Sequence, residues 1–174
     1  MTERVRIIAH VTCDCFTETH RITGRIGIGA TGLIGVLNDT SHSFTIIEDA
    51  YISRIQQPAA IMAHYSVARI AKRAFELIVL AKRDEINPPG APRTGPSRVA
   101  RHQVLAVTRE FEVRGIIEQP PGKLDADAVL IESAGRFFPM FNATATAHAQ
   151  PQIQFSGEAI LIGRGRVSLF CGGE

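Results

Sequence analysis

Short runs in which apolar and polar residues alternate make up most of this chain, and such alternation predicts half-buried β-strands. Residues 4–12 and 20–28 are rich in Val and Ile and predict two strands joined by a hairpin. A short helical turn is predicted over 33–38 and a third strand over 44–55. Residues 60–83 then allow either a strand, a turn and a second strand, or a helix with a basic face.

The C-terminal part of the chain repeats this order and favours one of the two alternatives. Its predicted elements are strands over 103–108, 110–117 and 137–147 and a helical turn over 125–131. The last stretch, 159–170, has two short apolar runs around Gly163-Arg164-Gly165-Arg166, which is typical of a hairpin. We therefore expect a strand, a turn and a strand over 60–83 as well, with the helix as the alternative.

A proline-rich segment separates the two parts. Residues 87–97 hold four prolines and two glycines, so they can form neither a helix nor a central strand. Segments of this composition are extended, semi-rigid spacers. The sequence thus predicts a first small β domain over 1–86, a linker over 87–98 and a second small β domain over 99–174.

The two predicted domains show a weak internal repeat. Residues match at an offset that stays between 91 and 96, for example Gly24 with Gly115, Phe44 with Phe137, Ile70 with Ile162 and Leu77 with Leu169. The predicted fold is therefore mainly β, with α+β as the alternative. It consists of two repeated small antiparallel sheets or barrels, each with about five strands and one short helical turn.

The second copy carries motifs that resemble an uncharacterised bacterial family of small domains. Its matching segments are Arg114-Gly115-Ile116, Pro120-Pro121-Gly122-Lys123-Leu124, Arg136-Phe137 and Ala143. The first copy matches at Gly24, Leu33, Leu37-Asn38, Phe44, Asp49-Ala50 and residues 70–75. Each copy also departs from the pattern, because the first has no Pro-Pro-Gly and the second has Leu130-Ile131 where the family has Leu-Asn. The resemblance implies no catalytic residues, and it favours a binding or scaffolding role.

Composition and charge place the chain among ordinary globular proteins. It has 174 residues with 45% hydrophobic and 21% charged residues and a net charge of +2. The whole basic excess comes from Arg93 and Arg98 in the linker, which argues against a large basic face for nucleic acid. The longest apolar run, 77–81, is far shorter than the roughly 18–20 residues of a membrane span, and residues 1–4 lack a signal-peptide core. We expect a cytoplasmic protein with no membrane span.

A glycine-rich stretch imitates a dinucleotide-binding motif. Residues 27–32 read Gly-Ile-Gly-Ala-Thr-Gly, and Asp49 follows at the spacing of the ribose-binding acid. That motif needs a helix of several turns and a parallel strand after the third glycine. Here the helical pattern ends near Leu37, so we expect a turn and no nucleotide cofactor.

Metal binding and catalysis have weak candidates. Cys13 and Cys15 lie on one side of an extended segment, with His10 and His20 nearby, which could suit a transition metal or a redox pair. The spacing is not that of a zinc knuckle, however, and packing is the favoured role of both thiols, as it is for Cys171. The six histidines are scattered and no catalytic set is apparent, so we expect neither an enzyme nor a metal site.

Two basic segments provide the only argument for nucleic acid. Lys72 and Arg73 in the first copy match Arg164 and Arg166 in the second, and all four are predicted at hairpin tips. Few aromatic residues lie near them, so a base-stacking platform is not apparent. The favoured function is a non-catalytic binding or scaffold protein that contacts another protein or assembles with itself. The alternative is binding of RNA or single-stranded DNA by these four residues.

Overall fold

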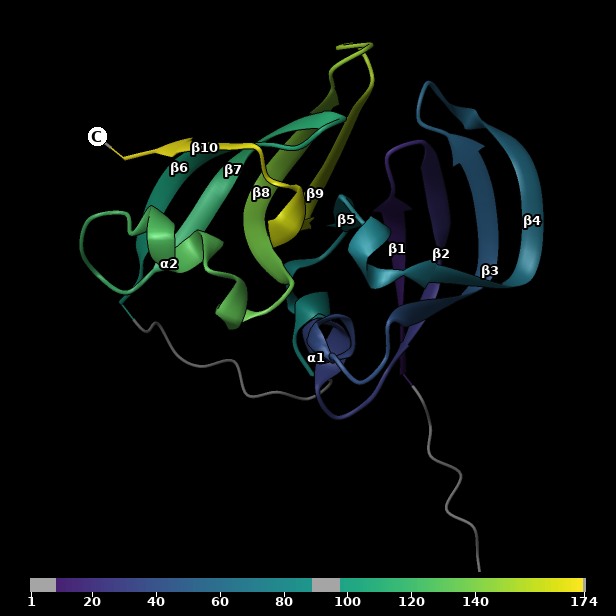
Figure 1. The fold of residues 1–174 in the computed structure, drawn as a ribbon, viewed down its shortest axis with the longest axis horizontal. Coiled ribbons are helices and arrows are strands. Elements are labelled where there is room, and N and C mark those ends of the chain that lie inside the picture. Colours follow the sequence, from purple (N-terminus) through teal and green to yellow (C-terminus); the bar gives the residue numbers. More distant parts are fainter. Residues whose placement is uncertain (1–8, 89–97, 174) are drawn as a thin grey trace, which may run out of the picture.

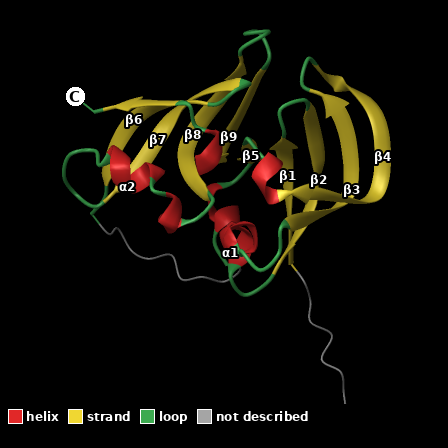
Figure 2. Cartoon of the chain, in the orientation of Figure 1, coloured by secondary structure: helices red, strands yellow, loops and turns green. Residues whose placement is uncertain are grey.

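The structure is a computed structural model that describes residues 9–88 and 98–173. The elements of residues 1–86, the first half, are β1 (Ala9–Phe16), β2 (His20–Ile28), α1 (Gly32–Asn38), β3 (Phe44–Arg54), β4 (Gln57–Ala71), η1 (Lys72–Ala74), β5 (Leu77–Leu80) and η2 (Arg83–Ile86). Those of residues 99–174, the second half, are β6 (Ala100–Val107), β7 (Phe111–Gln119), α2 (Ala126–Leu130), η3 (Glu132–Ala134), β8 (Phe137–Ala147), β9 (Gln154–Gly163), η4 (Arg164–Arg166) and β10 (Leu169–Gly172). Strands dominate and the helices are short (Figure 2).

All ten strands belong to one antiparallel sheet, in the order β10-β6-β7-β8-β9-β5-β1-β2-β3-β4. The mainly β, antiparallel class predicted from the sequence is confirmed. The expectation of two separate sheets is corrected, because β5 pairs with β1 of its own half and also with β9 of the other half. Figure 1 shows β10 and β4 at opposite ends of this sheet.

The two halves have the same strand order. In the first half the order is β5-β1-β2-β3-β4, and in the second it is β10-β6-β7-β8-β9. A short helix stands between the second and third strands of each half, and a three-residue 3₁₀ helix stands before the last strand. The duplication itself stays a prediction, but these shared positions allow residues of the two halves to be compared.

A matching irregularity bends both halves. The pairing register shifts at Gly24 in β2 and at Gly115 in β7, opposite Asp49 and Asn142, which both have a positive φ. A Cβ at Gly24 would lie 2.5 Å from the Ile47 side chain, and one at Gly115 would lie 2.7 Å from Ala143. Glycine is therefore required where the two strands approach most closely at these bulges.

Side chains of β5 join the two hydrophobic cores. Ile78 and Leu80 belong to the core of the first half, whereas Leu77 and Val79 belong to the core of the second half. Strand β9 alternates in the same way, because Ala159 and Leu161 pack in the first core and Ile160 in the second. The alternation follows from the two-residue period of a strand. The β5–β9 ladder thus makes one folded unit of the two halves.

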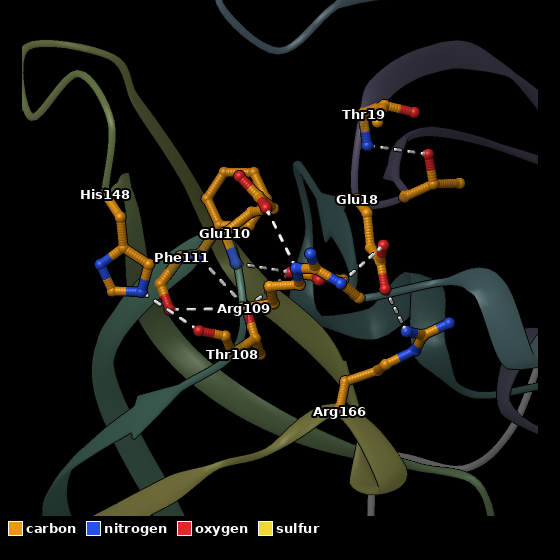
Figure 3. Close-up of polar contacts among 10 residues, drawn as sticks. Glu18, Thr19, Thr108, Arg109, Glu110, Phe111, His148 and Arg166 are labelled. Carbon is orange, nitrogen blue, oxygen red and sulfur yellow. Dashed lines mark hydrogen bonds and ion pairs between the residues drawn. The ribbon is translucent and has the colours of Figure 1, made fainter.

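Polar contacts also cross this junction. The buried carboxylate of Glu76 accepts a hydrogen bond from the Thr108 hydroxyl at 2.7 Å and one from the Glu110 backbone N–H at 3.2 Å. Glu18 accepts hydrogen bonds from Arg109 and Arg166 (Figure 3). Burial raises the pKa of Glu76, because the charged form is poorly solvated there.

The sequence predicted the elements of 60–83 and 159–170 but not how they pair. The strand, turn and strand interpretation of 60–83 is confirmed, and the helix alternative is wrong. The hairpin interpretation is also wrong, because β4 and β5 are not neighbours in the sheet, and neither are β9 and β10. In each half the 3₁₀ helix carries the chain across to a different part of the sheet. Residues 4–8 of the first predicted strand and 89–97 of the predicted linker lie outside the described residues.

Candidate functional site

The four basic residues singled out in the sequence come together at one cleft of about 500 Å³. The cleft lies between the two 3₁₀ helices η1 and η4 and the start of β8. Its lining includes Lys72, Arg73, Arg136, Arg164 and Arg166, together with Glu132 as an acidic residue. The structure thus places both basic segments at one site, although neither is a hairpin tip.

Lys72 has a structural environment within this cleft. Lys72 is only 3% exposed, and its Nζ donates hydrogen bonds of 2.7 Å to the carbonyl oxygens of Val36 and Asp39. These carbonyls lie at the C-terminal end of α1, where a cation is favourable. Burial lowers the pKa of Lys72. The ammonium group therefore fixes α1 to η1, and little of it faces solvent.

Arg164 is engaged in the same manner in the second half. Its guanidinium donates to the carbonyl oxygens of Val129 at 2.7 Å, Gly135 at 2.6 Å and Phe137 at 2.7 Å. Burial lowers the pKa of Arg164. The side chain joins α2, the following loop and β8, because three main-chain acceptors converge on it. Its donors are thus largely used within the protein.

The remaining cations of the cleft are Arg166, which spans the junction, and Arg73 and Arg136, which differ from the others in their contacts. Arg166 donates from Nε to the Arg73 carbonyl oxygen at 2.9 Å and from Nη1 to Glu18 at 2.8 Å. Among the described residues, the side chains of Arg73 and Arg136 have no hydrogen-bond or ion-pair partner. Arg73 is exposed and Arg136 half-buried. Within the described part of the chain, these two guanidinium groups of the cleft are the ones that keep all of their donors available for an anion.

The glycine-rich stretch 27–32 forms the end of β2 and a turn into α1. Helix α1 begins at Gly32, which has a φ of +68°, and it ends after seven residues. The next strand, β3, runs antiparallel to β2. A dinucleotide-binding unit requires a parallel strand after the helix, so this stretch has the sequence of that motif without its topology.

The cysteine pair lies inside the first core. The Sγ atoms of Cys13 and Cys15 are 3.6 Å apart, because both side chains point to the same face of β1. The hydrogen bond between the two thiols and the burial of Cys15 raise the pKa of Cys15 well above its ordinary value, which keeps this thiol protonated. Within residues 9–88 and 98–173, no cluster of three or more metal-ligating side chains is present. Cys171, in contrast, is exposed on β10.

The long strand β4 is the feature that the sequence analysis did not single out. It has fifteen residues, stands at the end of the sheet order and pairs only with β3 (Figure 1). One row of its backbone N–H and C=O groups therefore has no strand beside it among the described residues. We call this free side of β4, over residues 57–71, the β4 edge.

Large apolar side chains are exposed along the β4 edge and the neighbouring strand. On β4 these side chains are Ile61, Met62, Tyr65 and Val67, which are 43–60% exposed, and on β3 they are Phe44, Ile46 and Tyr51. Arg69 is the only Lys, Arg, Asp or Glu among residues 57–71. Edge strands that stay unpaired are usually short or carry several charges. The low charge of this long segment is the sequence signal that could have identified the edge.

The opposite end of the sheet is β10. It has four residues, and among the strands of the described residues it pairs with β6 only. Leu169 is 52% exposed and Cys171 is exposed, whereas Phe170 between them packs against the second core. One face of β10 therefore presents side chains that have no core to enter within residues 9–88 and 98–173.

Comparisons with known proteins give no guide to function: no protein-family model, no curated protein and no solved structure matches this chain. Among the described residues, no helix is long and apolar enough to cross a membrane.

Proposed function

We propose that this chain is a non-catalytic binding or scaffold protein that acts through protein–protein contact, and that the β4 edge is its docking element. The observation that carries the proposal is a fifteen-residue edge strand with exposed apolar side chains and a single charged residue. Contiguous exposed apolar surface beside unpaired backbone groups is typical of interaction sites.

Strand addition is the mode of binding that this edge suits. An extended segment of another chain would pair with the free N–H and C=O groups of β4, and the alternate side chains of β4 would set its position. The backbone of β4 is already held by its ladder with β3, which extends from Phe44 opposite Ala71 to Arg54 opposite Gln57. Docking would therefore require little reorganisation of the edge.

Nucleic-acid binding is the alternative, and the contacts in the basic cleft support it less. Lys72 and Arg164 direct their donors at main-chain carbonyls, and Arg166 is bound to Glu18. Arg73 and Arg136 remain available to contact phosphate groups. Two cations are few for nucleic-acid binding, because its affinity depends on neutralising several phosphates. We also propose that the protein has no catalytic activity, cofactor or metal and that it is cytoplasmic. These parts of the proposal rest on the sequence arguments above.

The test is the mass of the purified protein by light scattering after size exclusion, with absorbance recorded at 260 and 280 nm. The substitution Ala71→Pro should block the edge, because it removes the backbone N–H group of this residue. Strand β4 should keep its conformation, because Ala71 already has a φ of −60°, which proline adopts. Ala71→Ser keeps the N–H and serves as the control. We expect a protein-only assembly that persists in Ala71→Ser and is lost in Ala71→Pro.

Other outcomes contradict the proposal in different ways. An assembly that survives Ala71→Pro would place the docking surface away from this end of β4. A monomer with excess absorbance at 260 nm, removed by the double variant Arg73→Glu and Arg136→Glu and by added salt, would favour the nucleic-acid alternative. A monomer without nucleic acid at every concentration would leave self-assembly without support.

A further inference from the structure

The geometry points to a specific occupant of the β4 edge, namely β10 of a second copy of this chain. The inference rests on the proposed function, because it names the strand that docks there. In this arrangement β10 of one copy pairs antiparallel with β4 of the next, so that copies join head to tail. Each copy then contributes one edge of its sheet as donor and the other as acceptor.

The template for this contact exists within the chain. Strand β5 is the last strand of the first half, and it covers β9, the fourth strand along the second half. The last strand of the second half is β10, and the fourth strand of the first half is β4. Both lie at free ends of the sheet, so the contact made once between the two halves can be made again between copies.

The register of the new ladder follows from the old one. Within the chain Leu77 lies opposite Ile162, and Val79 lies opposite Ile160. The offset that relates η1 to η4 is 92 residues. Adding 92 to the β5 residues and subtracting 92 from the β9 residues places Leu169 opposite Ile70 and Cys171 opposite Ala68. Strands that bury one face cannot slip by one residue without exposing their apolar side chains, which favours this register.

Side-chain orientation supports the docked position. Leu77 and Val79 leave the core of their own half and enter the core of the other half, where Val79 is only 7% exposed. The corresponding residues of β10 are Leu169 and Cys171, and both are exposed. Docking on β4 would bring these two side chains to the first core of the next copy, beside the partly buried Ala68 and Ile70.

The backbone at the end of each acceptor strand has the same form. Gly163, the last residue of β9, has a φ of −67° and donates its N–H to the carbonyl oxygen of Glu76, just before β5, at 3.0 Å. Ala71, the last residue of β4, has a φ of −60° and is also followed by a 3₁₀ helix. Its N–H is therefore set to donate to the carbonyl oxygen of Ser168 in the second copy.

The two ladders differ at their ends, which affects strength. A Cβ at Gly157 would lie 2.3 Å from the Leu80 carbonyl oxygen, and one at Gly163 would lie 2.8 Å from that of Phe75. Strand β4 has Tyr65 and Ala71 at the corresponding positions. The copy-to-copy ladder must sit slightly farther out at these two points. We therefore expect a contact that is weaker than the β5–β9 junction and that depends on protein concentration.

The arrangement also determines the type of assembly. Donor and acceptor are different surfaces at opposite ends of the sheet, so the contact is heterologous (Figure 1). Such contacts produce a closed ring when the rotation from copy to copy closes, and an open chain when it does not. A symmetric dimer made by two β4 edges is the arrangement that this inference excludes.

The native thiol at position 171 allows a test with one substitution. In Ala68→Cys, the new thiol and Cys171 of the neighbouring copy would lie directly opposite each other, with Cβ atoms about 4.5–5.5 Å apart. Mild oxidation should then yield covalent multiples, and peptide mass spectrometry should identify the link between Cys171 and the substituted position. Val67→Cys is the matched control, because its side chain points to the other face of β4 at a more exposed position. Adding Cys171→Ser should abolish the link.

Each outcome decides the inference. The specific link in Ala68→Cys, at a rate at least tenfold above that of Val67→Cys, supports it. Equal rates for the two variants would indicate random collision and overturn it. An assembly that is sensitive to Ala71→Pro but gives no link to Cys171 would overturn the choice of β10 while leaving docking at the β4 edge intact. Failure of both the link and the assembly would overturn the inference and would also leave self-assembly, as one form of the proposed function, without support.

Discussion

Substitution of Leu77 by Ala tests whether the two halves are one folded unit. Leu77 belongs to the first half, is fully buried and packs in the core of the second half. The substitution removes three carbon groups, which cost about 2.4 kcal/mol in transfer free energy at about 0.8 kcal/mol each. The cavity left behind raises the expected loss in the free energy of unfolding to about 3–4 kcal/mol.

The matched control is Leu169→Ala at the corresponding position of β10. Leu169 is 52% exposed, so the same substitution removes about half as much buried surface and leaves no closed cavity. We expect a loss of about 1 kcal/mol in the monomer. Both substitutions should be made in the Ala71→Pro background, so that assembly does not contribute to the measured stability.

Urea unfolding followed by two probes provides the assay. Both tyrosines, Tyr51 and Tyr65, lie in the first half, so tyrosine fluorescence reports on that half alone, whereas far-UV circular dichroism reports on all strands. One cooperative unit predicts coincident transitions that shift together in Leu77→Ala. The reasoning would be refuted if Leu77→Ala cost no more than Leu169→Ala. Separate transitions for the two probes would refute it as well.

Three further substitutions test individual contacts. Glu76→Gln should raise the free energy of unfolding at neutral pH, and this advantage should shrink as pH falls. The reason is that the folded-state pKa of Glu76 lies above its ordinary value of 4.5, so protonation at lower pH relieves the buried charge. Urea titrations at several pH values would measure the effect, and an advantage that grows toward acid pH would contradict it. Lys72→Met should cost about 2 kcal/mol by leaving two carbonyl oxygens without their donor, as measured by urea unfolding, and a neutral effect would contradict the role given to Lys72. Gly115→Ala should lower the free energy of unfolding by about 1–3 kcal/mol in thermal or urea unfolding, because the added Cβ would meet Ala143. Gly165 has open space around it, so the control Gly165→Ala should be neutral. Equal losses for the two variants would contradict the close approach of the strands at the bulge.

Local patterns were sufficient for the elements of this fold. The predicted strands over 20–28 and 137–147 coincide with β2 and β8, and the turn over 33–38 lies within α1. Apolar alternation and Gly or Pro at the ends are properties of neighbouring residues, so a sequence displays them directly. The comparison of 60–83 with 159–170 was also sufficient to choose strands over a helix.

The pairing of strands was not accessible in the same way. Gly163-Arg164-Gly165-Arg166 resembles a hairpin turn, yet its three-residue 3₁₀ helix sends the chain to a strand on the other side of the half. Which partner a strand takes depends on contacts between residues far apart in the chain. The same is true of Lys72, whose acceptors Val36 and Asp39 lie more than thirty positions away. Its charge suggested solvent or phosphate, whereas the fold buries it against carbonyl groups.

The reactivity of Cys171 toward a thiol reagent tests the central claim most directly. Cys171 is the exposed thiol of the three, because Cys13 and Cys15 are buried in the first core. If β10 docks on the β4 edge of a second copy, the rate of modification should fall as protein concentration rises, and it should stay high at all concentrations in Ala71→Pro. A rate for the native protein that equals that of Ala71→Pro at every concentration would contradict the account.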